Sequence, residues 1–380
     1  MRVLHLVSSL DPRAGGPPKA LVGLANAQVQ QGLDVMVLCT TRPGDEPDYV
    51  DLLKARGTEV TLVGPTRTPL ELHPDLKKAI ERSVKKADIV HIHGIWEQLQ
   101  HLGALCARKQ GVPYIIRPCG MLDPWSLRQS RWRKRAYLAL RLRRDLNSAA
   151  AIHYTTPRER ELADPLGLKP PAIVEPNGID LSEFENLPPA GTFRSQHPQI
   201  GDRPMLLFLG RLHHKKGPDI LIEAFAQAAL PDAVLVLAGP GEDSYVAQLK
   251  ALVAKHNLED RVIFTGMLHG RDRIAAYADA DLFCLPSHQE NFGIAVVEAL
   301  AAGTPVLISD QVNIHEDITK KGVGKAVSLQ KNSISAGLVQ LYRSSIAYDQ
   351  CAKFAGSMYN WQCISTSWIK HYERMQESCS

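Results

Sequence analysis

Two glutamates within residues 285–309 (LPSHQENFGIAVVEALAAGTPVLIS) are the strongest candidates for chemistry. A predicted strand leads into a polar loop that holds Glu290, and Gly293 opens a predicted helix that contains Glu298. The first turn of a helix carries backbone N–H groups without intrahelical partners, so this turn could bind a phosphate. Glu290 could then meet a sugar hydroxyl and Glu298 a ribose, although spacing alone equally allows both carboxylates to cap and solvate the helix. The N–H groups concerned are those of Asn291, Phe292, Gly293 and Ile294.

A second candidate is the basic segment GRLHHKKG (210–217), which directly follows the predicted strand Met205–Leu209. A residue that follows a parallel strand lies at the carboxyl edge of its sheet, where ligands of open α/β sheets bind. Arg211 offers a bidentate guanidinium and Lys216 a compact positive charge, a combination that suits a diphosphate. A solvated basic loop is the alternative for this segment taken alone.

Histidines form a third group of candidates. His91 and His93 are two apart on a predicted strand, so their side chains share one face of the sheet. His93 is nearer the carboxyl end and could enter a binding site, while His153 follows the same logic more weakly. An H-x-H pair also suits a metal, but the sequence offers no evident third ligand, and we predict no metal site.

Strands that alternate with helices must position these residues. The alternation favours parallel sheets covered on both faces, wound with right-handed crossovers, and it begins again after residue 200. We therefore predict an α/β protein of two doubly wound, Rossmann-like domains that face a cleft. The predicted strands are Val3–Val7, Val35–Cys39, Glu59–Val63, Ile89–Ile92, Tyr114–Ile116, Ile152–Tyr154, Met205–Leu209, Ala233–Leu237, Arg261–Thr265, Leu282–Leu285 and Pro305–Ile308.

Composition places the domain boundaries. Residues 187–204 hold four Pro and two Gly, which is typical of a linker. We expect an N-terminal domain over 1–186 and a second domain over 205–359. The tail 360–380 has a helical pattern, and it either completes the second domain or crosses back to the first, which we favour.

The order of these motifs resembles the retaining glycosyltransferases of family four, which have the GT-B fold of two Rossmann-like domains. The resemblance rests on the E-x7-E pattern of Glu290 and Glu298 and on GRLHHKKG (210–217). Further support comes from SSLDPRAGGPPKAL (8–21), HIHGIW (91–96), RPCGMLDPWSL (117–127) and VEPNGID (174–180). RPCGMLDPWSL is most similar to members that build bacterial envelope and capsule polysaccharides.

The resemblance implies a role for each matching residue. Glu298 would bind the donor ribose, Glu290 would lie near the donor sugar, and Arg211 and Lys216 would hold the diphosphate. The backbone of residues 291–294 would contact sugar and phosphate. Gly15 and Gly16 would approach the diphosphate from the other domain, although two adjacent glycines also often only make a turn.

Two features qualify this implication. Cys119 stands where many members have a His that contacts the donor sugar, so the contact would pass to Arg117 or His93 or be absent. No D-x-D pattern follows a strand, which predicts transfer without a metal or other cofactor. The expected donor is a sugar linked to UDP or GDP, and the expected acceptor is a hydroxyl of a glycan or lipid-linked glycan.

Charge is concentrated in one segment. The net charge of the chain is only +4, which does not indicate a nucleic-acid binder, but residues 128–144 hold eight Lys or Arg and no acid. Leu127–Leu146 could form an interfacial helix on anionic lipid, or a solvated helix whose Arg stems cover the core. The seven cysteines include no C-x-x-C pair. We expect a reduced, cytoplasmic protein, which would associate with the membrane if 128–144 forms the interfacial helix.

Other functions fit less of the sequence. A dehydrogenase is suggested by Gly239-x-Gly241, but Ser244 stands where the third glycine of that fingerprint belongs. A sugar-nucleotide epimerase or hydrolase could use similar twin domains. A non-enzymatic membrane or nucleic-acid module built on 128–144 would leave the E-x7-E pattern and the basic loop unused.

Overall fold

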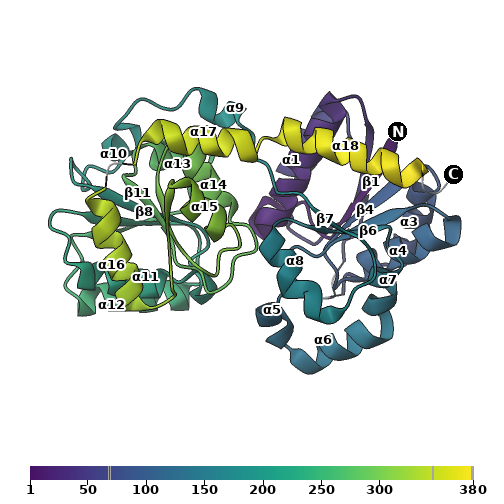
Figure 1. Cartoon of the computed structure of the whole chain (residues 1–380), viewed down its shortest axis with the longest axis horizontal. Helices are drawn as coiled ribbons and strands as arrows, with labels where there is room; N and C mark the ends of the chain where they lie inside the picture. The colour runs from purple at the N-terminus through teal and green to yellow at the C-terminus, as the bar shows by residue number, and fades with distance from the viewer. Residues whose placement is uncertain (67, 69, 345, 378–380) are drawn as a thin grey trace. The chain divides into compact units, whose positions relative to one another are not determined.

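The computed structural model describes residues 1–66, 68, 70–344 and 346–377. The chain divides into two compact units (Figure 1). The first comprises Met1–Gly178 together with the segment that begins at Trp361, and the second comprises Ile179–Asn360.

A seven-stranded parallel sheet forms the centre of the first unit. Its order is β3-β2-β1-β4-β5-β6-β7, so the direction of winding reverses between β1 and β4. The strands are β1 (Arg2–Val7), β2 (Asp34–Thr40), β3 (Glu59–Val63), β4 (Ile89–His93), β5 (Tyr114–Arg117), β6 (Ala151–Tyr154) and β7 (Ala172–Val174). The helices are α1 (Gly16–Gln30), α2 (Asp48–Ala55), α3 (Leu76–Val84), α4 (Gln98–Gln110), α5 (Pro124–Arg128), α6 (Arg131–Tyr137), α7 (Arg143–Asn147), α8 (Pro157–Ala163) and α18 (Trp361–Glu377).

The two faces of this sheet differ in chemistry. Side chains such as Leu4, Leu6 and Ile92 form an apolar core with residues of α3, α4 and α7. The opposite face carries buried histidines, and α1 and α18 pack side by side there (Figure 1). A Cβ atom on Gly23 would lie 2.1 Å from the Trp361 indole, so glycine lets these two helices approach closely.

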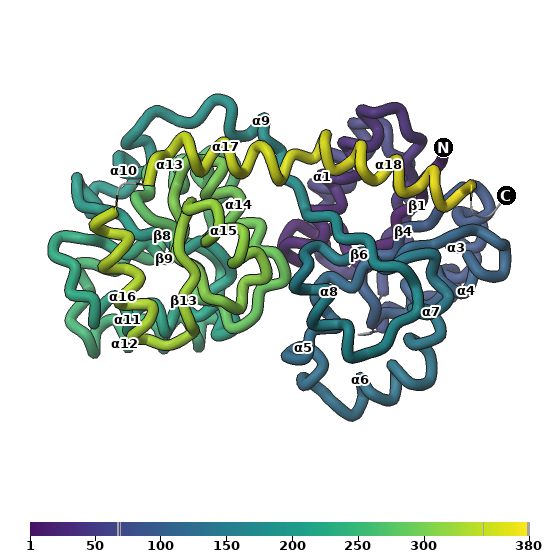
Figure 2. Tube along the Cα trace, viewed as in Figure 1, coloured from purple at the N-terminus to yellow at the C-terminus, as the bar shows by residue number. Residues whose placement is uncertain are grey.

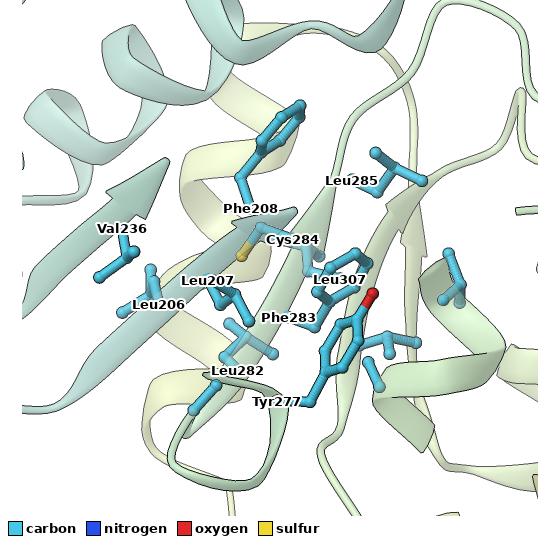
Figure 3. Close-up of a cluster of buried hydrophobic side chains, with 14 of the residues drawn as sticks. Leu206, Leu207, Phe208, Val236, Tyr277, Leu282, Phe283, Cys284, Leu285 and Leu307 are labelled. Carbon is cyan, nitrogen blue, oxygen red and sulfur yellow. The ribbon is translucent and has the colours of Figure 1, made fainter. Parts of the chain in front are cut away.

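The second unit contains a six-stranded parallel sheet. Its order, β10-β9-β8-β11-β12-β13, again reverses beside the first strand. The strands are β8 (Met205–Leu209), β9 (Val234–Ala238), β10 (Val262–Gly266), β11 (Leu282–Leu285), β12 (Val306–Ser309) and β13 (Gly324–Val327). Runs such as MLLFL and LFCL are apolar at nearly every position because helices bury both faces of the sheet. Figure 3 shows part of this core, including Phe208, Phe283 and Tyr277.

Helices cover both faces of this second sheet. They are α9 (Ser182–Glu185), α10 (Thr192–Gln196), α11 (Pro218–Ala228), α12 (Asp243–Lys255), α13 (Gly270–Ala278), α14 (Ile294–Ala301), α15 (His315–Lys321), α16 (Lys331–Tyr342) and α17 (Tyr348–Met358). The predicted class of two doubly wound α/β domains is therefore confirmed.

Domain boundaries differ in detail from those expected. The contact-based division falls after Gly178 rather than after residue 186, and the segment from Trp361 is grouped with the first unit. Residues 187–204, expected as a linker, lie inside the second unit, where Phe193 and Ile200 are fully buried. The Asp279 carboxylate accepts hydrogen bonds from the backbone N–H groups of Gly191, Phe193 and Arg194, which anchors this Pro-rich stretch.

The basic segment is helical over most of the expected range Leu127–Leu146, but it is not one regular α-helix. A left-handed residue, Ser130, separates α5 from α6, and a π-helical stretch (Leu138–Leu142) joins α6 to α7. Figure 2 shows α5 and α6 at the edge of the first unit, away from its sheet. No helix among the described residues combines the length and the apolar character needed to cross a bilayer.

Candidate active site

Sheet topology brings the two motifs of the second unit together. β8 pairs with β11, with Leu206 opposite Leu282 and Leu207 opposite Phe283. The loops that follow these strands, 210–217 and 286–293, therefore leave the same edge of the sheet side by side. This is the point where the winding reverses, which is where open α/β sheets bind their ligands.

Close backbone packing holds these loops in place. Gly217 has φ +70°, and a Cβ atom there would lie 2.2 Å from the Pro286 carbonyl oxygen. The His288 N–H donates to the Lys215 carbonyl at 2.8 Å. Gly239 explains the apparent dinucleotide fingerprint, because its Cβ would lie 1.9 Å from the Gly210 carbonyl oxygen. The glycine thus serves packing between neighbouring loops.

Lys216 and Glu290 form an ion pair between the two loops. The backbone of Glu290 is fixed on both sides, since its N–H donates to Gln311 and its carbonyl accepts from Asn313. Burial acts to raise the pKa of the Glu290 carboxyl, but the charge of Lys216 and the N–H of Gly293 outweigh it and lower the pKa. Glu290 is therefore a carboxylate at neutral pH, held at the N-terminus of α14.

Glu298 lies inside α14 and is buried in a separate polar cluster. Its carboxylate accepts a hydrogen bond from the Tyr277 hydroxyl at 3.0 Å and pairs with the Arg273 guanidinium. Arg273 also pairs with Glu183 of α9. Arg273 and Tyr277 were not predicted as site residues from the sequence, although their spacing of four residues in a predicted helix places both on one face.

Arg211, by contrast, is exposed to solvent at the start of the basic loop. Lys215 and Lys216 lie in a 3-10 turn (His214–Lys216), in which the Lys215 N–H donates to His213 Nδ1 at 3.1 Å. This turn directs Lys216 towards Glu290. The second unit therefore brings Arg211, Lys216, Glu290 and the first turn of α14 to one sheet edge.

Candidates of the first unit lie at the carboxyl edge of its own sheet. Gly15 has φ +95° between a short 3-10 helix (Pro12–Ala14) and α1, and Gly16 is the first residue of α1. Both glycines are exposed. Their predicted contact with a diphosphate concerns the other unit and stays a prediction.

His93, Arg117 and Cys119 lie close together at the ends of β4 and β5, and their role in binding a sugar or acceptor stays a prediction. His93 and Arg117 face each other across β4 and β5, and both are 2% exposed. Cys119 adopts a left-handed conformation with φ +54°, which is unusual for a residue other than glycine. The Glu159 carboxylate accepts from the Gly120 N–H at 2.6 Å and so fixes the turn. Burial raises the pKa of the Cys119 thiol, which keeps it protonated.

The structure also supplies a third histidine that the sequence analysis missed. His5 of β1 faces His91 of β4, and ligand nitrogens of His5, His91 and His93 lie within 4.8 Å of one another. Strand register brings His5 there, and its only sequence signal is an isolated His within an apolar strand. Metal independence is not tested by this geometry and stays a prediction.

Comparison with known proteins identifies the family. Residues 15–178 match the model of a glycosyl transferase 4-like domain, and residues 191–357 match that of glycosyl transferases group 1. The chain is a glycosyltransferase of family four. The E-x7-E pattern and the basic loop both lie within the second matched region.

Relatives of this glycosyltransferase span nearly its whole length. It is 25% identical to the D-inositol 3-phosphate glycosyltransferase of Jonesia denitrificans, over 97% of this chain and 93% of the relative. It is also 25% identical to the GDP-mannose:cellobiosyl-diphosphopolyprenol alpha-mannosyltransferase of Xanthomonas campestris, over 98% and 96%.

Solved structures support the GT-B fold. The Anabaena protein HepE in complex with UDP gives a TM-score of 0.80 at 20% identity, covering 98% of this chain and all of HepE. WaaG, a glycosyltransferase of lipopolysaccharide biosynthesis, gives 0.70 at 19% identity, covering 98% and 99%. The predicted fold family and enzyme class are confirmed.

Proposed function

We propose that this glycosyltransferase moves a sugar from a UDP- or GDP-linked donor to a hydroxyl of a glycan or lipid-linked glycan, with retention and without a metal. The observation that carries the proposal is the Lys216–Glu290 pair at the N-terminus of α14, with Arg211 in the same loop as Lys216. These groups supply positive charge and N–H donors at a sheet edge suited to a nucleotide.

Charge development in the reaction explains the choice of these residues. When the anomeric C–O bond breaks, the departing nucleoside diphosphate gains negative charge and the sugar becomes oxocarbenium-like. Lys216 and Arg211 stabilise that negative charge from fixed positions, and the partial positive charge of the α14 N-terminus adds to it. Removing one such donor is expected to cost about 3–4 kcal/mol, or ~10²–10³ in rate.

Glu290 has two functions in this proposal. It orients the Lys216 ammonium before the donor binds, and its carboxylate lies close enough to the α14 N-terminus to contact a sugar hydroxyl. Glu298 would hold the ribose, with Arg273 and Tyr277 fixing its carboxylate. His93, Arg117 and Cys119 are proposed to line the sugar or acceptor side, and Gly15 and Gly16 to approach the diphosphate.

The acceptor proposal is supported by the relatives and by the basic segment. The Xanthomonas relative is named for a diphosphopolyprenol-linked acceptor. In this chain, α6 carries four cations, and Trp132 beside them is 77% exposed, which suits contact with anionic lipid. We propose that this segment holds the enzyme at a membrane surface that carries the acceptor, in polysaccharide biosynthesis.

A transfer assay separates this proposal from its alternative. UDP- and GDP-sugars are supplied with and without a glycan acceptor, in buffer containing EDTA, and the product anomer is assigned by NMR. Acceptor-dependent transfer with retention in EDTA is expected. Free sugar or an epimer formed rapidly without acceptor would instead indicate a hydrolase or epimerase. Activity lost in EDTA and restored by Mg²⁺ or Mn²⁺ would contradict metal independence.

A further inference from the structure

Four buried histidines and three neighbouring side chains of the first unit form one continuous chain of hydrogen bonds. His5 Nε2 lies 2.8 Å from the Gln28 amide oxygen, so this nitrogen carries a proton, and in a neutral imidazole His5 Nδ1 is then the acceptor. His93 Nε2, 3.0 Å from that Nδ1, must therefore donate. The Nδ1 of His93 is left as an acceptor, and it faces the Arg117 guanidinium at 3.5 Å.

The series of hydrogen bonds continues from Gln28 to the remaining two histidines. Its amide nitrogen donates to the Tyr372 hydroxyl at 3.1 Å, and that hydroxyl donates to His91 Nδ1 at 2.9 Å. His91 Nε2 then donates to His153 Nδ1 at 3.1 Å, and His153 Nε2 donates to the Glu175 carbonyl at 2.9 Å. In this assignment every imidazole donates once and accepts once, which is the hydrogen-bonding pattern of four neutral rings.

Electrostatics agree with this assignment. The pKa of each of the four imidazoles is lowered, mainly by burial, with a further contribution from the charge of Arg117. The same hydrogen bonds occupy both ring nitrogens of His5, His91 and His93, which could otherwise bind a metal. A metal would have to break these hydrogen bonds, so the cluster is better explained as a polar, uncharged support.

Arg117 is the charged end of this chain of hydrogen bonds. Among the described residues, no carboxylate forms an ion pair with it, although it is only 2% exposed. Its Nη2 donates to the Asn177 amide oxygen, its contact with His93 is long, and its buried Nε has no hydrogen-bond partner. Burying an unpaired charge is costly, and neutral imidazoles solvate the guanidinium without cancelling its charge.

We infer that Arg117 is an anion site at the carboxyl edge of the first sheet, which takes a phosphate or diphosphate group of a substrate. The inference deepens the proposed function and rests on it for the choice of substrate. The anion belongs either to a lipid diphosphate-linked acceptor or to the nucleotide donor. His93, His5 and the rest of the chain are positioning residues that keep this guanidinium oriented and uncompensated.

Asn177→Asp tests the inference with almost no change of shape. The new carboxylate would occupy the position of an amide that already accepts from Arg117, and would neutralise its charge. We expect the unliganded variant to unfold at the same or a higher temperature than the wild-type enzyme. We expect its affinity for the anion to fall at least tenfold. Arg117→Lys keeps the positive charge but loses the bidentate geometry of the guanidinium. This variant should retain more affinity for the anion than Asn177→Asp.

The probes are farnesyl diphosphate, UDP and GDP, with binding measured by calorimetry and thermal shift on the full chain. Loss of farnesyl diphosphate binding in Asn177→Asp assigns the site to the acceptor, and loss of UDP or GDP binding assigns it to the donor. Wild-type affinity of Asn177→Asp for all three probes would overturn the inference, as would a wild-type enzyme that binds none of them.

Two further variants separate this inference from the proposed function. Arg108 pairs with Asp145 in the same unit, so Arg108→Gln should lower the unfolding temperature and leave binding of all probes unchanged. Loss of farnesyl diphosphate binding in Arg108→Gln as well would overturn the inference, since any destabilisation would then suffice. Lys216→Ala should weaken UDP and GDP binding but keep farnesyl diphosphate binding. Unchanged nucleotide affinity in Lys216→Ala counts against the proposed donor site alone.

Discussion

The Lys216 ammonium and the Glu290 carboxylate form an ion pair, although 74 positions separate them in the chain. Each follows a different strand, and the pairing of β8 with β11 brings them to one edge of the sheet. Neither is fully exposed, with side-chain exposures of 27% and 17%. The two motifs thus form one site.

Replacing either partner tests that site. Lys216→Ala and Glu290→Ala are expected to lower kcat by ~10²–10³, because the first removes a positive charge that is fixed before the reaction and the second removes the carboxylate that orients it. Both variants should fold, since the pair is partly solvated and lies at a loop. Steady-state kinetics with circular dichroism would measure this. Lys353→Ala removes an exposed ion pair on α17 and should leave kcat unchanged; near-normal turnover in both site variants would refute the assignment.

Tyr277→Phe tests the support of Glu298. The change removes a 3.0 Å hydrogen bond to a buried carboxylate, worth about 1.5–3 kcal/mol. We expect the KM for the nucleotide sugar to rise about tenfold with kcat little changed, because the ribose gains no charge in the reaction. Tyr342→Phe, which loses a surface bond to the Pro231 carbonyl, is the matched control. A fall in kcat alone would contradict this role.

Much of the fold could be predicted because buried parallel strands have an unmistakable composition. Met205–Leu209 and Leu282–Leu285 have the same bounds in the structure as in the prediction. Predictions from local sequence patterns failed for segments whose backbone conformation depends on more than their own residues. Residues 187–204 resemble a linker until Asp279 satisfies their N–H groups, and the π-helical stretch Leu138–Leu142 interrupts a segment that has a regular helical pattern.

Some residues of the candidate site could likewise be predicted from the sequence, and others could not. Arg211, Lys216 and Glu290 follow predicted strands, and a residue after a strand must lie at the sheet edge. The histidine chain could not be predicted, because His91 meets Tyr372 across 281 positions and His5 joins through strand register. The partners of Glu298 were missed because a helical pattern shows which face a residue occupies, but not what covers that face.

The buried histidines make stability depend on pH. The pKa of His5 is lowered to about 4 by burial, against about 6.5 in the unfolded chain. The unfolded state therefore binds protons first as the pH falls from 6.5 towards 4, and stability decreases across that window. His5 alone should cost about 2 kcal/mol at pH 5. Urea unfolding at pH 7.5 and 5 would measure this, and His5→Gln should reduce the difference; a flat profile would contradict it.

Membrane contact through α6 is tested with vesicles. Arg131, Arg133 and Arg135 are replaced together by Ser, while Lys134 is kept because it donates to the Ser126 carbonyl at 2.6 Å. Each cation near an anionic surface contributes about 1 kcal/mol, so three should weaken binding by roughly 100-fold. Co-sedimentation with phosphatidylserine vesicles measures it.

A matched control for the vesicle experiment is available in the same unit. Lys77, Lys78 and Arg82 of α3 are replaced by Ser, which removes the same charge from another surface. This variant should retain most of the binding. Unchanged binding of the α6 variant, or equal loss in both variants, would show that α6 is not the contact surface.

The most direct measurement is a crystal structure of the enzyme with UDP or GDP. The account predicts a diphosphate at the carboxyl edge of the second sheet, bound by the Arg211 guanidinium and the Lys216 ammonium beside the first turn of α14. A nucleotide bound with its phosphates away from both side chains, or an empty site at saturating nucleotide, would contradict it.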